Sequence, residues 1–361
     1  MPQLKFSIII INYNYGRFLA EAISSALAID IPEKEIIVVD DGSTDNSAAV
    51  IKSFASQIIP LFKTNGGALS CVNVGFRRSS GDIVIFLDAD DRISCNVAKL
   101  VLSVWDQGVA KIQYLANVID ASGASLGRVQ PYFSKILTQS DIRQSLIRTT
   151  NYITSACSAN AYARWYLAEI LPLRESYTAH KNSPDNLLNP IAPLYGRIIT
   201  LQLPLCDYRH HGANDGVLAR VDIANITRMI RRDQERLDFV TEKALQRKIL
   251  ISADALLHCP YHVNACIVIH KHSPELSPYT ISLARLTALG IRATLGYPCI
   301  GVSQKLALVA WLLCLCLAPR PIALRLIALR YVPNSRPQWA TLLLSWFRVK
   351  GKTAGNCVLK I

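Results

Sequence analysis

Residues 83–91 read IVIFLDADD, in which five apolar residues run directly into Asp88, Asp90 and Asp91. A run this short and this uniformly apolar is typical of a strand covered on both faces of a parallel sheet. Carboxylates at one strand end repel each other unless a cation lies between them, and Mg²⁺ or Mn²⁺ binds such oxygens while leaving positions open for phosphate. Because the D-x-D pattern is short, a solvated turn or a helix cap is the alternative interpretation.

The same pattern recurs on the N-terminal side of this stretch. Apolar runs that predict buried strands alternate with segments of helical periodicity. This alternation indicates βαβ units and a parallel sheet, whose carboxyl edge binds ligands. The predicted strands are 6–11, 35–39, 58–62 and 83–87, and the predicted helices are 16–27, 46–55 and 69–77.

The second half of the chain has weaker patterns. We expect strands at 111–119 and 198–205, a helix that starts near 140 and reaches 148, and mainly helical structure over 223–257. Short helices interrupted by Pro and Gly are predicted for the remainder. No internal repeat or low-complexity segment is evident.

The formal net charge of +13 is concentrated near the C-terminus, where residues 276–361 contain eleven Lys or Arg and no Asp or Glu. Basic, apolar and aromatic residues over 301–361 favour peripheral contact with an anionic membrane. Packing of these helices on the preceding domain or on an oligomer partner is the alternative. The longest apolar run, 306–318, is too short to span a bilayer, which needs about 20 residues.

The ten cysteines are scattered, and the first residues lack the pattern of a secretory signal. We therefore expect reduced thiols and a cytoplasmic protein, with the inner face of the membrane as a possible location. His258, Cys259, His262 and Cys266 do not have the spacing of a zinc site. Residues 270–272, His-Lys-His, are expected to form an exposed loop.

The motifs SIIIINYNYGRFLAEAISSAL, EIIVVDDGSTDNS, KTNGGALSCVNVGFRRSSGD and IVIFLDADD occur in one order within residues 5–92. In that order and spacing they resemble the family 2 glycosyltransferases. CDYRHHGAND at 206–215 is similar to a tyrosine-arginine-x-histidine segment downstream in many members. The resemblance implies a GT-A fold, an α/β Rossmann-like architecture with a mixed, mainly parallel sheet flanked by helices. It divides the chain into a catalytic domain, 1–218, and a helical, basic extension, 219–361. A donor half, about 1–95, precedes an acceptor half, about 96–218.

The resemblance also implies a donor site. Asp41, with Asp40, accepts a hydrogen bond from the nucleotide base, and a carboxylate suits the imide N–H of uracil, so a UDP-sugar is favoured. The alternatives are helix capping for the two aspartates and a simple turn for the glycines. The implied donor-binding residues are Asn12, Tyr13, Asn14, Asp40, Asp41, Asn65, Gly66, Asn73, Asp88, Ala89 and Asp90.

A divalent metal, Mg²⁺ or Mn²⁺, is implied at Asp88, Asp90 and His211, where it stabilises charge on the leaving diphosphate. For the two histidines at 210–211, an ordinary hydrogen-bonded turn is the alternative. Asp185 matches the position of the family's general base, which removes the acceptor proton in an inverting transfer. Pro184 replaces the acidic or small residue that many members have there, and a helix cap is the alternative role for Asp185.

The resulting hypothesis is an inverting transfer of sugar from a nucleotide diphosphate to a glycan or lipid-linked acceptor, in cell-surface polysaccharide synthesis. A binding protein that keeps the fold without catalysis is one alternative. A basic nucleic-acid-binding protein is another, but before the tail no aromatic residues are interleaved with the basic ones, so we expect no nucleic-acid partner.

Overall fold

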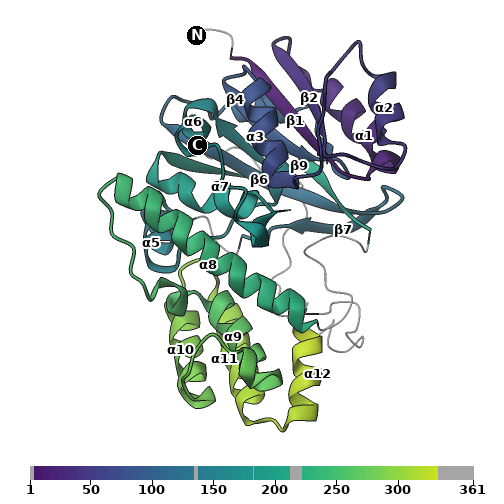
Figure 1. Ribbon diagram of the computed structural model, residues 1–361. Coiled ribbons are helices and arrows are strands. Elements are labelled where there is room, and N and C mark those ends of the chain that lie inside the picture. The colour runs from purple at the N-terminus through teal and green to yellow at the C-terminus, as the bar shows by residue number, and fades with distance from the viewer. Residues whose placement is uncertain (1–3, 134–136, 182, 212–221, 332–361) are drawn as a thin grey trace.

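The structure is a computed structural model that describes residues 4–133, 137–181, 183–211 and 222–331. It combines one large sheet with helices on both of its faces and a group of helices below it (Figure 1). The strands are β1 (Phe6–Asn12), β2 (Lys34–Asp40), β3 (Ile59–Phe62), β4 (Ile83–Asp88), β5 (Arg92–Ile93), β6 (Val109–Asp120), β7 (Ser125–Gln130), β8 (Asn160–Ala163) and β9 (Arg197–His210).

The helices follow the strands through the first two thirds of the chain and then continue without strands. They are α1 (Gly16–Leu27), α2 (Ser47–Ser53), α3 (Ala68–Arg78), α4 (Val97–Leu102), α5 (Gln139–Thr149), α6 (Arg164–Ile170), α7 (Asp185–Ile191), α8 (Ile223–Gln246), α9 (Pro260–His272), α10 (Leu283–Gly296), α11 (Val302–Leu317) and α12 (Arg320–Tyr331).

The strand order is β3-β2-β1-β4-β8-β6-β9-β5, with β7 paired to β6. The four strands from β3 to β4 are parallel, whereas β8 runs antiparallel to both of its neighbours. The predicted mixed α/β sheet with flanking helices is therefore confirmed. Asn12 lies opposite Asp40, and Ile11 lies opposite Asp88. This register brings the carboxyl ends of β1, β2 and β4 to one edge.

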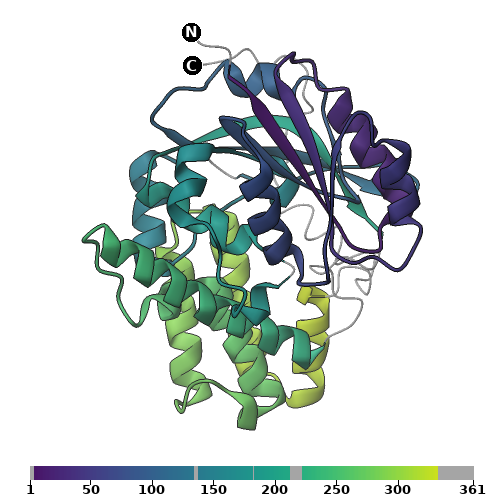
Figure 2. The ribbon, with the colours of Figure 1, turned by 45° about the horizontal axis from the view of Figure 1, so that its top comes forward.

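Strand β1 shows why the central strands are mostly apolar. Ile9 and Ile11 belong to a cluster that includes residues of α3, while Ile8 and Ile10 belong to the cluster that contains α1. Figure 2 shows helices on both faces of these strands. Each fully buried Ile contributes about 1.5–3 kcal/mol relative to an exposed one. The two apolar layers thus fix the position of the polar strand ends.

Helix α8 connects the sheet to the helical group. Its first half contributes Ile226 and Ile230 to a cluster with α9–α12, and its second half contributes Phe239 and Val240 to the core beneath the sheet. Figure 1 shows α8 running between the two groups. The core of the catalytic unit thus extends beyond residue 219, where the sequence places the start of the extension; that boundary stays a prediction.

Within the segment 223–257, where helical periodicity dominates the sequence, α8 ends at Gln246 because Lys248 adopts a left-handed conformation with φ of 57°. The amide of Ile249 then bonds to the carbonyl of Ala244, a Schellman-type end. The predicted loop at 270–272 is instead the last turn of α9 and is half-buried.

In the described part of the chain, no helix combines the length and apolar character needed to cross a membrane. The cysteines of these residues are free thiols.

Close packing of α3 on β1 leads to a stability prediction. A Cβ atom on Gly75 would lie 2.4 Å from Cγ2 of the fully buried Ile9. We expect Gly75→Ala to lower the free energy of unfolding by about 1–2 kcal/mol, because overpacking outweighs the gain in helix propensity. Urea denaturation measures the change. Gly108→Ala, whose nearest contact is the end of a side chain at 3.3 Å, is the control and should be nearly neutral.

Candidate active site

A cavity of about 830 Å³ lies where β1, β2 and β4 end. It brings together residues from the start of the chain, from the acidic loop after β4 and from the first turn of α7. Of the residues predicted from sequence for donor, metal or catalysis, the cavity wall includes Tyr13, Asn14, Asp41, Asn65, Asp88, Ala89, Asp90 and Asp185.

Asn12 and Asp40 lie behind the wall and brace it. The Asn12 amide donates to the Asp40 carboxylate at 2.7 Å, and both groups are buried. Ser43 donates to the same carboxylate through its hydroxyl, at 2.6 Å, and its backbone amide, at 3.0 Å. Asn14 accepts from the amide of Thr44 at 2.7 Å. The turn after β2 is therefore tied to the end of β1.

Asp41 holds the glycine loop that follows β3. Its carboxylate accepts from the amide of Gly66 at 2.8 Å and of Gly67 at 2.6 Å, and forms an ion pair with Lys63. Gly67 has φ of 87°, and a Cβ there would overlap Lys181, so this position requires glycine. The Gly66 amide thus contributes to the site by holding the Asp41 carboxylate in place. Sequence reasoning missed Lys63, although it stands just before the Asn-Gly-Gly stretch.

Asp88, Asp90 and Asp185 form the acidic part of the cavity wall. Burial, with the charges of Asp90 and Asp185, raises the pKa of Asp88 to about 8. Burial also raises the pKa of Asp185, and the positive charges of Arg232 and Lys111 oppose that rise. Asp91, which points away from this wall, has a pKa far above its usual value because it is buried beside the other two aspartates of the loop. This concentration of negative charge favours a cation in the cavity.

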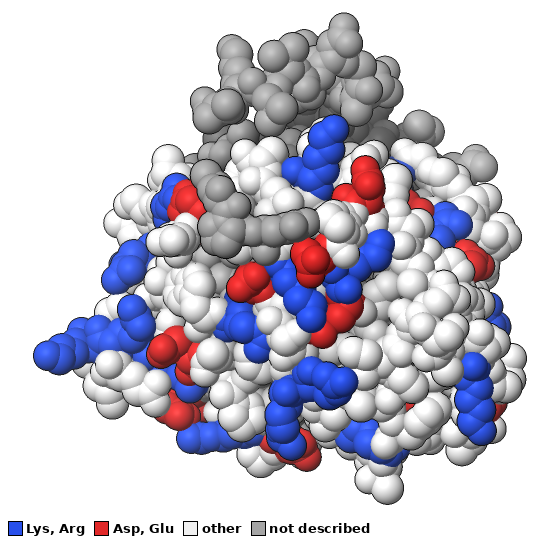
Figure 3. All heavy atoms as spheres, turned by 90° about the horizontal axis from the view of Figure 1, so that it is seen from above, with Lys and Arg blue, Asp and Glu red and all other residues white. Residues whose placement is uncertain are grey.

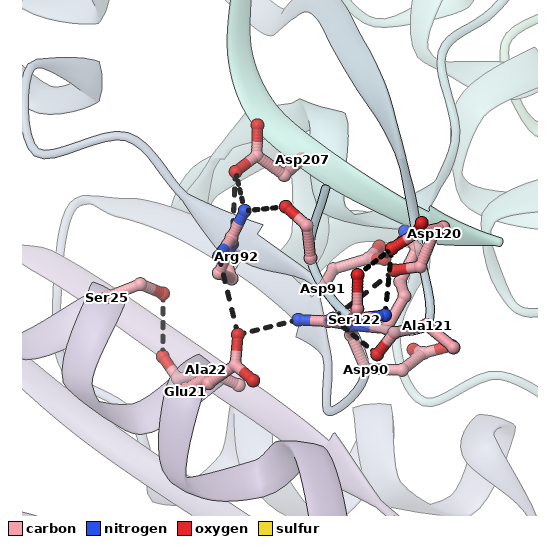
Figure 4. Close-up of polar contacts among 12 residues, drawn as sticks. Glu21, Ala22, Ser25, Asp90, Asp91, Arg92, Asp120, Ala121, Ser122 and Asp207 are labelled. Carbon is pink, nitrogen blue, oxygen red and sulfur yellow. Dashed lines mark hydrogen bonds and ion pairs between the residues drawn. The ribbon is translucent and has the colours of Figure 1, made fainter. Parts of the chain in front are cut away.

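The end of β9 clamps the acidic loop. Arg209 is fully buried, and its backbone amide donates to Asp91 at 2.9 Å while Nε donates to the carbonyl of Asp90 at 2.8 Å. Its guanidinium also pairs with Glu21 at 2.8 Å. Arg92 pairs with Asp207 at 2.9 Å and with Glu21 at 3.4 Å, and Figure 4 shows it between these two carboxylates. Sequence reasoning missed Arg209, although it lies in the same motif as His211.

His211 lies next to Asp90 but does not face the cavity. Its Nε2 is 2.9 Å from Oδ2 of Asp90, and its ring contacts the rings of Tyr15 and Phe18. In the described residues, no group of three or more His, Cys, Asp or Glu side chains is arranged to hold a metal ion. The ligand set of Asp88, Asp90 and His211 therefore stays a prediction, and the contact shown is that of His211 supporting Asp90. Mg²⁺ sites commonly use one or two carboxylates with substrate phosphates, which Asp88 and Asp90 fit.

Asn73 lies away from the cavity wall. Its amide is buried, donates to the carbonyl of Leu173 at 2.9 Å and accepts from the Leu173 amide at 2.8 Å. Both hydrogen-bonding groups of the side chain thus fasten α3 to the segment before α7. The structure does not place Asn73 with the other predicted donor-binding residues.

The histidine and cysteine cluster of α9 is a buried polar link. His262 bonds to Asp233 on α8 at 2.9 Å and to the hydroxyl of Tyr279 at 3.0 Å. Burial raises the pKa of both Cys259, to about 11, and Cys266. The cluster thus joins α8 and α9 through buried hydrogen bonds.

Comparison with known proteins identifies the family. The family profile described as Glycosyl transferase family 2 matches residues 7–162. The uncharacterized glycosyltransferase alr2836 of Nostoc sp. is 33% identical over 222 residues, which cover 60% of this chain and 68% of the relative. The chain belongs to glycosyltransferase family 2. It is accordingly a glycosyltransferase.

More distant relatives match only in part. The uncharacterized glycosyltransferase RC0461 of Rickettsia conorii is 32% identical over 181 residues, 47% of this chain and 30% of that protein. The poly(ribitol-phosphate) beta-N-acetylglucosaminyltransferase TarS of Staphylococcus aureus is 32% identical over 103 residues, 27% of this chain and 18% of TarS. This family 2 chain therefore spans less than a third of the length of these two relatives.

A solved structure of similar fold extends the comparison. The crystal structure of S. aureus TarS residues 1–349 in complex with UDP aligns with a TM-score of 0.51 and 18% identity, over 99% of this chain and 95% of that one. At this identity the similarity shows the fold alone. The predicted GT-A fold with a helical C-terminal region is thus confirmed.

The raised pKa of Asp88 predicts a gain in stability when that charge is removed. Between its ordinary value of 3.8 and about 8, the folded chain keeps a proton that the unfolded chain has lost. The stabilisation that the neutral Asp88 carboxyl gives the folded chain is fully present below about pH 4 and is lost as the pH rises through about 8. We expect Asp88→Asn, without metal, to have a free energy of unfolding about 1–3 kcal/mol higher than that of the wild type at pH 9. This range is reduced to allow for screening by solvent.

The measurement is urea unfolding at pH 5, 7 and 9 in EDTA, with the advantage of the variant growing along this series. Asp30→Asn, an exposed residue, serves as the control. A variant less stable than the wild type at every pH would contradict the electrostatic interpretation.

Proposed function

We propose that the chain transfers a sugar from a nucleotide diphosphate donor to a glycan or lipid-linked acceptor, with inversion, in cell-surface polysaccharide synthesis. The observation that carries this proposal is the meeting of Asp41, Asp88, Asp90 and Asp185 in one cavity. Such a cavity accommodates a base, a diphosphate and an acceptor hydroxyl in sequence. The name of the relative TarS, a poly(ribitol-phosphate) beta-N-acetylglucosaminyltransferase, supports an acceptor of the cell-surface polymer class.

The donor lies in this proposal along the ends of β1 and β2. Tyr13, Asn14, Asp41 and Asn65 border the base and ribose. Asp41 has one carboxylate oxygen that accepts from two donors and another that accepts from the Gly67 amide. The second oxygen has capacity for one more hydrogen bond, as the imide N–H of uracil requires. A UDP-sugar is therefore favoured, and TarS has been solved in complex with UDP and with UDP-GlcNAc.

Asp88 and Asp90 would hold the divalent metal, with His211 supporting Asp90. When bound, Mg²⁺ or Mn²⁺ supplies Lewis-acid stabilisation of the leaving diphosphate. The two carboxylates orient the phosphate end of the donor and become compatible with each other once the ion is present.

Asp185 would act as the general base toward the acceptor hydroxyl. It lies in the cavity wall and precedes the rest of α7, so its carboxylate faces both the cavity and the positive end of a short helix. Burial raises its pKa above the usual value of an aspartate, which makes it a stronger base than an exposed carboxylate.

The two other function classes have less support. A binding protein without catalysis would not require a carboxylate at Asp185 beside the metal pair. A nucleic-acid-binding protein would present a continuous basic surface, whereas Figure 3 shows Lys and Arg lying beside Asp and Glu on the face seen from above.

The site at Asp185 predicts a separation of binding from turnover. We expect Asp185→Asn to lower the rate of transfer, or of donor hydrolysis, by about 10²–10⁴-fold because the amide cannot accept the proton. The dissociation constant for the nucleotide should stay within about threefold. Steady-state kinetics and calorimetric titration measure the two quantities, and Asp30→Asn is the matched control. Near-normal turnover of Asp185→Asn would remove this residue from the mechanism.

The donor class is tested by thermal shift. UDP-GlcNAc, UDP-glucose, UDP-galactose and GDP-mannose are each added with and without Mn²⁺. A ligand at 100 times its Kd stabilises the folded state by about 2.7 kcal/mol. We expect the largest rise in Tm with a UDP-sugar and Mn²⁺ together, and a smaller rise when Asp90 is changed to Asn. Equal shifts with and without Mn²⁺ would exclude the metal role.

We further propose a cytoplasmic protein that contacts the inner face of an anionic membrane through the region 301–361. In the described part of that region, α11 exposes an apolar stripe at Val302, Leu306, Leu313 and Leu317, whose exposed fractions are 74%, 61%, 46% and 83%. The exposed residues Arg320 and Arg325 follow it on α12. Apolar and basic groups in this order suit a bilayer that contains anionic lipid.

Vesicle sedimentation tests the membrane contact. We expect Leu306→Glu with Leu313→Glu to reduce binding to vesicles containing 30% phosphatidylglycerol by about tenfold or more, since two apolar side chains no longer enter the lipid. Leu250→Glu, at a leucine outside α11 that is more exposed than either of these two, should bind like the wild type. Equal pelleting of all three proteins, or pelleting that follows self-association, would contradict the proposal.

A further inference from the structure

Helix α7 needs support from outside itself. It has seven residues, of which Asp185 is the first, and Pro190 lies within it. A helix this short is unstable in isolation because nucleation is costly, and Pro removes one of its hydrogen bonds. The position of the Asp185 carboxylate therefore depends on what holds α7 against the sheet.

The buried side chain of Asn189, one turn after Asp185, is the polar anchor of α7. Its carbonyl oxygen accepts from Nζ of Lys111 on β6 at 3.0 Å and from the hydroxyl of Tyr162 on β8 at 2.8 Å. Its amide donates to the carbonyl of Ser155 at 3.2 Å. Three separate segments of the chain thus converge on one amide.

Two tyrosine hydroxyls complete the attachment. Tyr152 donates to the backbone carbonyl of Asn189 at 3.0 Å, and Tyr166 donates to that of Leu188. These carbonyls lie in the last turn of the helix, and that of Asn189 also accepts from the amide of Ala192 at the C-cap. We call Lys111, Tyr152, Tyr162 and Tyr166 the α7 clamp.

Lys111 is the unusual member of the α7 clamp because it is a lysine with no exposed surface. Its other hydrogen-bond partner is the amide oxygen of Gln113 at 3.0 Å, and its Nζ lies 5.4 Å from the ring centre of Tyr152. Burial lowers the pKa of Lys111 well below its usual value, and the charge of Asp185 opposes that drop. Burying an amine that bonds to amide oxygens costs free energy, and an apolar residue of the same length would be cheaper for folding alone.

We propose that Lys111 is a positioning residue of the transfer reaction, which holds through Asn189 the short helix that presents Asp185 to the cavity. This inference rests on the proposed function. Lys111 does not line the cavity, so it acts on the reaction by holding α7 and not by touching a ligand. Its removal should therefore affect the step that uses Asp185 and leave the donor site at β1 and β2 intact.

The test is Lys111→Met, which keeps the length of the side chain and removes the amine. With the fastest UDP-sugar of the donor panel, we expect kcat to fall about 10- to 100-fold, the usual effect of misplacing a catalytic group by about 1 Å. KM for the donor should change less than threefold. Lys99→Met, at an exposed lysine, should match the wild type in both constants.

A purely structural role is distinguished by a double-mutant comparison. If Lys111 acts through Asn189, then Lys111→Met combined with Asn189→Leu should lower kcat no further than the more damaging of the two single changes. The proposal would be overturned if the effects of the two single changes on kcat multiplied in the double mutant. It would also be overturned if the Lys111→Met protein were less stable but kept the wild-type kcat per folded molecule.

Tyr162→Phe is the second variant, in case Lys111→Met does not fold. It removes one of the two donors to the Asn189 oxygen and leaves the amine in place, so we expect a kcat about 3- to 10-fold lower with the donor KM unchanged. An unchanged kcat here would also overturn the inference. A wild-type protein that turns over none of the panel, however, would count against the proposed function rather than against the α7 clamp.

Discussion

Mutual repulsion of carboxylates is the constraint on which this structure depends. Asp88, Asp90 and Asp185 come from distant parts of the chain and face one cavity, and burial raises the pKa of the first to about 8. Such an arrangement persists only if packing elsewhere offsets its cost. The apolar layers on both faces of the sheet provide that packing, and a divalent ion with its diphosphate would relieve the repulsion during turnover.

Many of the polar residues near the cavity bind each other. Asn12 and Asp40 join the ends of two strands, and Asp41 closes the glycine loop through two backbone amides. Arg209 does the same for the acidic loop. Groups fixed in this way need little reorganisation when a ligand arrives, which is the general advantage of a preorganised site.

The sequence was sufficient for the parts of the fold that repeat a simple pattern. The strand runs at 6–11 and 83–87 are apolar except at Ser7 because helices cover both faces, and polar residues follow each run where the sheet edge must lie. Local patterns could not reveal that Asn73 bonds to Leu173, a hundred residues away, or that Lys111 is buried against α7. Strand β8 and the end of α8 at Gln246 could not be located for a related reason, since tertiary pairing decides the first and the left-handed Lys248 decides the second.

The place of Arg209 in the chain has a consequence for synthesis on the ribosome. Its guanidinium bonds to the carbonyl of Asp90, which precedes it by 119 residues, and to Glu21 near the start. At a translation rate of about 5–20 residues per second, the N-terminal strands leave the exit tunnel several seconds before this arginine does. During that interval the acidic loop of the nascent chain is not yet bonded to Arg209. The chain can therefore hold a donor only late in synthesis, once β9 has inserted between β6 and β5.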